Sequence, residues 1–278
     1  MKNWRRYKNN AMLTLLSIAT VLALVPLFAV LGYVTKNGIS AINLDFFTNL
    51  PKPLGQPGGG MANAIVGTLT MVGIGSLIGI PTGILTAIYL SEYDRSSWFS
   101  TTVRFTTDVL TGIPSIIIGI FVYTVVVLTM GNFSAIAGGI SLGIIMIPMV
   151  TRSTEEMLKL VPHTIREAAY ALGIPKWKTI VKVVLPTAAR GITTGSMLAV
   201  ARVSGETAPL MFTALGNNYW AYSLNEPIAA LPLQIYQYAT SPYEEWHRQA
   251  WAGALVLVLL VVSLNLLARF TFRTRRSY

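Results

Sequence analysis

One pair of charged residues lies inside an apolar stretch of the sequence. Arg202 and Glu206 stand within the run from Gly191 to Leu210, which is long and apolar enough to form a membrane-spanning helix. Arg202 falls about 16 Å along such a helix, near the middle of the hydrocarbon core, where an unpaired charge costs on the order of 3 kcal/mol. Glu206 follows four residues later, so the spacing predicts that the two side chains meet on one helix face.

This pair has two interpretations that the residues leave open. In the first, Arg202 and Glu206 neutralise each other and only stabilise the helix. In the second, Arg202 lines a translocation path for an oxyanion, because its planar guanidinium can donate two hydrogen bonds to a phosphate group. Glu206 would then hold Arg202 in place or move with it during gating, and the neighbouring Thr207 would lie on the same path.

Two prolines are expected to break the apolar segments near this pair. Pro209 follows Glu206 closely and would free backbone groups, which a membrane tolerates only beside protein or a water-filled cavity. Pro114, within the sequence Thr111-Gly-Ile-Pro-Ser115, predicts a second break. This second break has two interpretations, a hinge or gate in the pathway and a simple kink.

The composition places these residues in a membrane protein rather than a soluble one. Of the 278 residues, 53% are hydrophobic and 12% are charged, and the mean hydropathy is +0.57. Soluble domains are about 25% charged, and a chain this apolar does not stay disordered in water. Cysteine is absent and there are two histidines, so we expect no disulfide and no metal site. The sequence has no H-E-x-x-H motif, and we do not expect an enzyme.

Apolar runs of about 20 residues are typical of helices that cross a membrane. The sequence contains about six, and no alternating strand pattern competes with them. We therefore expect an all-α integral membrane protein with spans at 11–34, 62–90, 108–130, 136–151, 191–215 and 249–268, the fourth of which could extend toward Met157. In the second span, Gly75, Gly79 and Gly83 form a row that predicts close packing against another helix, of this chain or of a partner.

The basic residues indicate how the spans are oriented. All but four of the 21 lysines and arginines lie at the N-terminus, at the C-terminus or in the connections after the second and fourth spans. Cytoplasmic loops are enriched in these residues, so both termini are predicted to be cytoplasmic. The net charge of +10 is then a consequence of topology, and nucleic-acid binding is not predicted. The first apolar stretch is longer than that of a secretory signal, so we expect an uncleaved span.

The connection between the fourth and fifth spans, about 152–190, carries helix signals of its own. The sequence Thr164-Ile-Arg-Glu167 fits a capping box at a helix start, and Gly173 is suited to a left-handed helix stop. Pro175 is suited to a first helical position, and Pro186 is expected to end the second helix. Two short helices joined in this way predict either a rigid knob that fits a groove on another protein or an amphipathic pair on the membrane surface.

The same connection resembles the EAA motif of ABC importer permeases. Glu167-Ala168-Ala169, Gly173 and the group Val183-x-Leu185-Pro186 have the spacing of the motif, with Val183 in place of the usual isoleucine. The resemblance implies a type I ABC importer permease core (MetI-like), with Glu167, Ala168, Ala169 and Gly173 in a coupling helix that fits into an ATP-hydrolysing subunit. This chain has no G-x-x-x-x-G-K-[ST] sequence, so ATP would be hydrolysed by a partner.

A longer block, ARVSGETAPLMFTALGN at 201–217, resembles the PstA-type permease family of phosphate-specific ABC importers, as do other blocks within 58–268. The resemblance implies a subunit of the bacterial plasma membrane that imports inorganic phosphate and has no cofactor. The implied partners are a second homologous permease, two ATP-binding subunits and an extracytoplasmic phosphate-binding protein. It also implies that the membrane-embedded Arg and Glu of the family fall on Arg202 and Glu206.

Two other functions stay open on the sequence. One is a permease for another oxyanion such as molybdate or sulfate, and the other is an ion-coupled secondary transporter that uses Arg202 and Glu206 as a relay. For the permease we expect three parts along the chain. These are a first span with an extracytoplasmic loop over 1–60, a permease domain over 61–270 and a basic cytoplasmic tail over 271–278.

Overall fold

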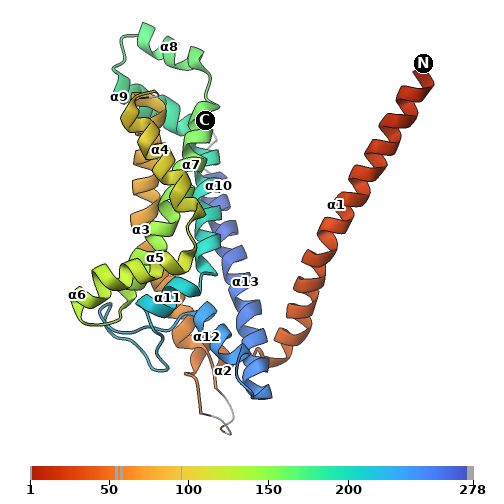
Figure 1. The fold of residues 1–278 in the computed structure, drawn as a ribbon, viewed down its shortest axis with the longest axis vertical. Coiled ribbons are helices and arrows are strands. Elements are labelled where there is room, and N and C mark those ends of the chain that lie inside the picture. The colour runs from red at the N-terminus through yellow and green to blue at the C-terminus, as the bar shows by residue number, and fades with distance from the viewer. Residues whose placement is uncertain (1, 54–55, 57–58, 95, 274–278) are drawn as a thin grey trace.

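The computed structural model describes residues 2–53, 56, 59–94 and 96–273, and most of this part of the chain is helical (Figure 1). In chain order the elements are α1 (Lys2–Gly38), η1 (Ile39–Ala41), α2 (Leu44–Thr48), α3 (Ala62–Ile88), η2 (Tyr89–Tyr93), α4 (Trp98–Gly112), α5 (Ser115–Val122), η3 (Tyr123–Val127), α6 (Leu128–Met130), α7 (Ala135–Lys159), α8 (His163–Ala171), α9 (Lys176–Thr179), η4 (Ile180–Val184), α10 (Leu185–Ser204), α11 (Ala208–Thr213), α12 (Leu231–Ala239) and α13 (Glu244–Arg273). Here η1 is a 3₁₀ turn, and η2, η3 and η4 are π-helical turns.

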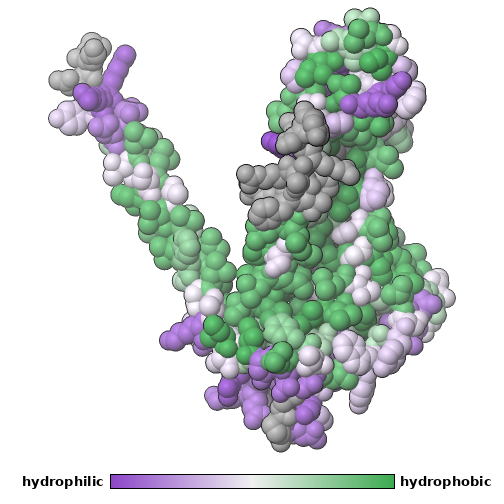
Figure 2. Space-filling model, turned by 180° about the vertical axis from the view of Figure 1, so that it is seen from behind, coloured by the Kyte–Doolittle hydropathy of each residue, from purple (hydrophilic) through white to green (hydrophobic). Residues whose placement is uncertain are grey.

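Five helical segments of the described chain are long and apolar enough to cross a membrane. A bent pair, Trp98–Gly112 with Ser115–Met130, brings the number to six if it is counted as one span. The surface agrees, since a wide hydrophobic band separates hydrophilic patches at the two ends of the molecule (Figure 2). The predicted all-α membrane fold is therefore confirmed, and the first, second, fourth and sixth expected spans correspond to α1, α3, α7 and α13.

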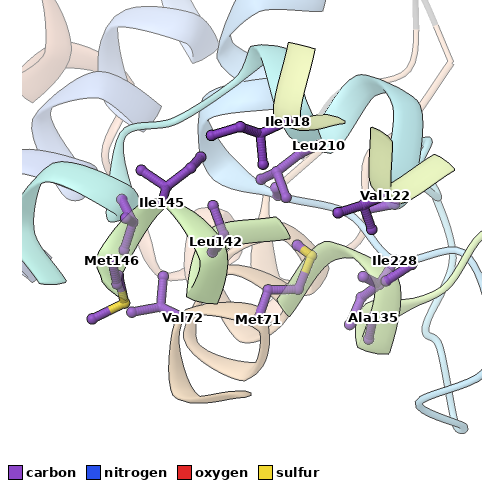
Figure 3. Packing of buried hydrophobic residues seen from close by; sticks show 14 of the residues in the cluster. Met71, Val72, Ile118, Val122, Ala135, Leu142, Ile145, Met146, Leu210 and Ile228 are labelled. Carbon is purple, nitrogen blue, oxygen red and sulfur yellow. The ribbon is translucent and has the colours of Figure 1, made fainter. Parts of the chain in front are cut away.

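Close packing between α3 and α7 forms the centre of the bundle. A Cβ atom on Gly79 would lie 2.6 Å from the Cβ atom of Met146, and Gly75 and Gly83 face α7 in the same way. The predicted row of small residues thus packs against a helix of the same chain. The buried cluster beside it connects α3 and α7 to α5 and α11 (Figure 3).

The third expected span, 108–130, corresponds to two helices joined at a sharp bend, and its expected start is wrong. Helix α4 begins earlier, at Trp98, and the helices on either side of Pro114 are bent by 104°. Proline has no N–H to donate and excludes the preceding residue from the helical conformation. Ile113 is accordingly extended, with φ −72° and ψ 131°. The predicted break at Pro114 is confirmed.

The fifth expected span, 191–215, is wrong at both ends. One continuous helical run extends from Lys176 to Ser204. Pro186 does not end a helix but lies in the first turn of α10, where its missing N–H is tolerated. At the other end the chain leaves the helix after Ser204, and Pro209 lies in the first turn of the separate helix α11 rather than inside a long one.

The connection that precedes α10 is shorter than the expected range 152–190. Helix α7 continues to Lys159 and the next helical run begins at Lys176, so α8 occupies most of what remains. Figure 1 shows α8 beyond one end of the bundle, at the end where α1 begins and α13 finishes.

Local signals around α8 are partly confirmed. Thr164 does not cap the helix, because α8 begins one residue earlier, after Pro162, and has no side-chain cap. Pro175 precedes α9 rather than occupying its first position. Gly173 has a φ of +73°, which confirms the predicted left-handed stop.

Helix α1 leans away from the bundle along most of its length (Figure 1). Its apolar stretch is 0% buried in this chain. Contact with α13 is confined to its C-terminal end, where the rings of Tyr33 and Trp251 lie 5.1 Å apart. A long apolar helix with so little cover must be covered by lipid or by another protein.

Candidate functional site

Arg202 lies in the last turn of α10 and makes only a loose pair with Glu206. Its Nε atom is 3.8 Å from Glu206 Oε1, which is beyond hydrogen-bond distance. The Arg202 side chain is 56% exposed and that of Glu206 is 16% exposed. The two groups approach each other although Glu206 lies outside the helix. A loose, exposed pair contributes little stability, which favours the interpretation that the guanidinium is available to an anion.

The break between α4 and α5 lies next to Arg202. Pro114 forms the N-cap of α5. A shallow recess is lined by Arg202, by residues on both sides of the break and by residues of α7, namely Leu110, Thr111, Ile113, Ser115, Ile118, Ile145 and Met149. The fold thus brings together two features, Arg202 and the Pro114 break, that are far apart in the sequence.

Close packing between α5 and α11 places the break at Pro114 beside the break that follows α10. A Cβ atom on Gly119 of α5 would lie 2.6 Å from the Cα atom of Pro209 and 3.1 Å from its carbonyl oxygen. Thr207 is the N-cap residue of α11, and its carbonyl oxygen accepts hydrogen bonds from the N–H groups of Leu210 and Met211. The side chains of Glu206 and Thr207 are half-buried, whereas Pro209 is buried in this contact.

A second candidate site is the outer surface of α8. Glu167 and Ala168 are exposed there, whereas Ala169 is buried against the bundle. Leu172, which follows α8, is 79% exposed, and Trp177 of α9 is 60% exposed. Exposed apolar side chains on a firmly held short helix are typical of a surface that binds another protein.

Gly173 fixes the direction in which the chain leaves α8. Its N–H group donates to the carbonyl of Tyr170 at 2.9 Å, and the N–H of Ile174 donates to the carbonyl of Ala169 at 3.2 Å. With a positive φ at Gly173, this pair of bonds is a Schellman motif, which satisfies carbonyl groups at a helix end. Glu167, Ala168, Ala169 and Gly173 therefore belong to one short helix and the turn that ends it.

Comparison with known proteins gives this arrangement a family. The profile of the binding-protein-dependent transport system inner membrane component matches residues 79–276. The chain is 47% identical over 274 residues to the phosphate transport system permease protein PstA of Yersinia pestis, covering 98% of this chain and 92% of that protein. The PstA protein of Haemophilus influenzae is 45% identical over 273 residues, covering 98% and 96%. The chain belongs to the binding-protein-dependent inner membrane component family.

Solved structures show the same fold. A chain of the MetNI methionine ABC transporter in an inward-facing conformation has a TM-score of 0.62 at 20% identity, covering 78% of this chain and 98% of that one. A chain of a bacterial ABC transporter that imports the polysaccharide alginate has a TM-score of 0.62 at 17% identity, covering 100% of both chains. The predicted MetI-like importer core is confirmed. As a member of the family, the chain is a non-catalytic, multi-pass subunit of the inner membrane.

The sequence analysis missed two groups of buried charges that hold α8 and α7 in place in this family member. Glu92 pairs with Arg166 across 74 positions of sequence, and Glu155 pairs with both Arg104 and Lys159. The only sequence signal for these pairs is a glutamate at the end of an apolar segment. A single sequence does not say which arginine, far along the chain, meets which glutamate.

Two titratable groups outside the long spans have shifted pKa values. Hydrogen bonds from Ser97, together with other bonds from Ser96 and Ser100, lower the pKa of the Asp94 carboxyl, although partial burial opposes this shift. Asp94 therefore stays charged close to the start of α4, where a negative charge is favourable. Burial raises the pKa of Tyr238, which remains a neutral phenol stacked 4.8 Å from Trp246.

One further cavity in the described part of the chain is lined mainly by polar side chains. A polar cavity of about 170 Å³ lies between the end of α11 and α12, lined in part by Asn217, Asn218, Gln234 and Gln237. Within the ranges given above, no cluster of three or more histidine, aspartate or glutamate side chains could hold a metal ion. Arg202 and the α8 surface therefore remain the two candidate sites with chemistry suited to transport.

Proposed function

We propose that this chain is a transmembrane permease subunit of an ATP-driven importer of inorganic phosphate. The observation that carries the proposal is a sequence identity of 45–47%, over 98% of this chain, to proteins named phosphate transport system permease. Arg202 supports the proposal, because an exposed guanidinium beside the break between α4 and α5 is suited to bind phosphate as a monoanion or a dianion. A guanidinium can also bind molybdate or sulfate, so the selectivity among oxyanions must be measured directly.

Arg202, Glu206 and Thr207 form the substrate pathway in this proposal. Arg202 attracts the anion, and Glu206 limits how far the guanidinium can swing, since its carboxylate lies 3.8 Å away. The breaks at Pro114 and at the start of α11, close to Pro209, act as the gate, because backbone that is not helical can turn without breaking a ladder of hydrogen bonds.

Helix α8 is the coupling helix, and its exposed residues Glu167 and Ala168 enter a groove on an ATP-binding subunit. ATP closes two such subunits, and the displaced coupling helices shift the permease toward its outward-open state. The end of the molecule that carries α8 is then cytoplasmic. Both the start of α1 and the end of α13 lie at that end (Figure 1), and this supports the proposal that both termini are cytoplasmic. Residues 274–278 of the expected tail over 271–278 lie outside the described residues.

A second homologous permease completes the pathway. Within this chain, Arg202 lies at an open surface rather than in an enclosed channel. The apolar stretch of α1 has no cover in the described chain, and a neighbouring permease would supply it. In this arrangement 1–60 provides the helix that reaches the partner, and 61–270 provides the permease domain. An extracytoplasmic phosphate-binding protein delivers the substrate at the opposite end.

Reconstitution of the whole transporter tests the proposal. The chain is assembled with its second permease, two ATP-binding subunits and the binding protein in liposomes, and uptake of phosphate, sulfate and molybdate is compared with and without ATP inside. We expect ATP-dependent uptake of phosphate that ionophores do not abolish. Equal uptake of sulfate or molybdate would contradict the substrate, and uptake that follows an ion gradient without ATP would favour a secondary transporter.

The Gly173 turn gives a prediction about coupling. Replacing Gly173 by valine places a β-branched residue at a φ of +73°, which costs about 1–2 kcal/mol. Crowding does not contribute, because a Cβ atom at Gly173 would meet no other atom within 4 Å. We expect Gly173→Val to lower phosphate transported per ATP hydrolysed several-fold. Gly173→Asn, which tolerates this conformation, should behave like the parent, and a valine variant with the parent ratio would show that the turn does not matter.

A further inference from the structure

Glu92 and Arg166 form a buried ion pair between the end of α3 and α8. Arg166 Nη2 lies 2.6 Å from Glu92 Oε1, and Arg166 Nε lies 3.0 Å from Glu92 Oε2. The two groups therefore meet through two parallel hydrogen bonds, and their side chains are 3% and 6% exposed. Such a two-point contact fixes the relative orientation of the groups as well as their separation.

The remaining donors of Arg166 bind the end of α7. Nη1 donates to the carbonyl oxygen of Val161 at 2.6 Å, and Nη2 donates to that of Leu158 at 2.9 Å. The Leu158 carbonyl also accepts a bond from the N–H of Val161 at 3.3 Å, so Arg166 adds a second bond at this helix end. Arg166 thus joins α8 to both α3 and α7, which are the closely packed pair at the centre of the bundle.

Glu92 lies in the π-helical turn η2, which a second arginine holds from another side. Arg104 of α4 donates from Nη2 to the carbonyl oxygen of Leu90 at 2.8 Å and from Nε to Glu155 of α7 at 2.9 Å. Turns of this kind are rare and are often found at functional sites. From this contact α4 runs to the break at Pro114, beside Arg202.

We propose that Glu92 and Arg166 are positioning residues that lock the coupling helix α8 to the α3–α7 pair, so that α8 and the bundle move as one rigid unit. The proposal rests on the proposed function for the meaning of that movement. The π turn then receives the displacement of α8 through Arg166, and Arg104 passes it to α4 and the break. Without the lock, the ATP-binding subunit turns α8 on its own and the gate stays where it was.

A role in stability alone is the competing explanation. A buried ion pair is weak evidence for a role in stability, because the loss of hydration offsets the attraction between the charges. Apolar side chains of similar volume often stabilise a fold equally well. Apolar side chains would fill this space without fixing the angle of α8, however. The two explanations therefore differ in what a well-folded variant without the pair should do.

The first test measures the angle directly and does not depend on the transported substrate. The natural chain has no cysteine, so spin labels can be placed at Tyr170→Cys on α8 and Leu85→Cys on α3, both of which are exposed. In the assembled transporter we expect one narrow distance distribution for the parent and at least a twofold wider one for Glu92→Gln. An amide cannot accept hydrogen bonds at both of its terminal atoms, so this substitution removes one of the two bonds. An unchanged width would overturn the proposal.

The second test measures coupling. Glu92→Gln should hydrolyse ATP within about twofold of the parent and should transport at least tenfold less phosphate per ATP, because the contact that orients α8 is lost. The matched control is Glu156→Gln, whose side chain is exposed and pairs loosely with Arg152, and it should keep the parent ratio. A parent ratio in Glu92→Gln would overturn the proposal, whatever the total activity.

A double variant decides the matter if Glu92→Gln does not assemble. Glu92→Leu combined with Arg166→Met removes both charges and restores an apolar fit, and we expect it to assemble and remain uncoupled. If this variant transports phosphate at the parent ratio, the pair only stabilises the fold and the proposal is wrong. If the parent complex itself moves no phosphate, the proposed function fails, and the distance measurement still decides whether the pair fixes α8.

Discussion

Arg202→Ala is expected to reduce ATP-driven phosphate uptake by roughly 100-fold. A hydrogen bond to a charged group contributes about 1.5–3 kcal/mol, each 1.4 kcal/mol corresponds to about tenfold, and the guanidinium can donate two such bonds to the anion. The side chain is more than half exposed and is only loosely paired, so the chain itself should fold normally without it. Initial rates of phosphate uptake into liposomes that contain the assembled transporter measure the effect.

Arg190→Ala provides the matched control for this experiment. Arg190 lies on the same helix, α10, and is exposed, but it is not part of the recess beside the Pro114 break. Its replacement should leave uptake within about twofold of the parent, as is usual for surface positions. Arg202→Lys separates charge from shape, since lysine keeps the charge and loses the planar fork, and we expect it to fall between the parent and Arg202→Ala. Unchanged uptake in Arg202→Ala would rule out Arg202 as a ligand or gate.

The sequence predicted the presence of most helices better than their ends. Length and apolarity determine whether a segment can span a membrane, and this is why α3, α7 and α13 were found. The position of a break depends on finer features. Pro114 coincides with a bend of 104° between two helices, whereas Pro186 lies directly after the π turn η4 inside a continuous helical run. The two prolines look alike in the sequence.

The candidate site was predicted residue by residue but not as an arrangement. The spacing of Arg202 and Glu206 predicted their proximity, which the structure shows at 3.8 Å, although one of the two lies outside the helix. The approach of Arg202 to the Pro114 break depends on how α10 packs beside α4 and α5, and no local pattern encodes that. The same holds for Glu92 and Arg166, whose pairing requires the α8 connection to fold back on the end of α3.

Gly119→Val is the second substitution with a large expected effect, a reduction of uptake by at least tenfold. The added Cβ atom would lie 2.6 Å from the Cα atom of Pro209 and 3.1 Å from its carbonyl oxygen. Overpacking of this kind typically costs about 1–3 kcal/mol. Because α5 and α11 would have to separate, Thr207 and the end of α10 would move relative to the Pro114 break. Uptake and the thermal unfolding midpoint of the purified transporter measure the two consequences.

Gly73→Val is the control for the helix propensity of valine. Gly73 also lies inside an expected span, in α3, and a Cβ atom there would meet nothing within 4 Å. It should keep both the uptake and the unfolding midpoint of the parent. If Gly119→Val does the same, the close contact between α5 and α11 is absent from the working transporter.

The atoms that Gly119→Val would strike belong to the backbone of Pro209, which gives the prediction a further consequence. A side chain can rotate away from a new neighbour, but a backbone atom moves only with its helix. Combining Gly119→Val with Pro209→Ala should therefore not restore uptake, because alanine leaves the Cα and carbonyl oxygen in place. Restored uptake in the double variant would mean that the proline ring, and not the approach of the two helix backbones, sets the distance between the two breaks.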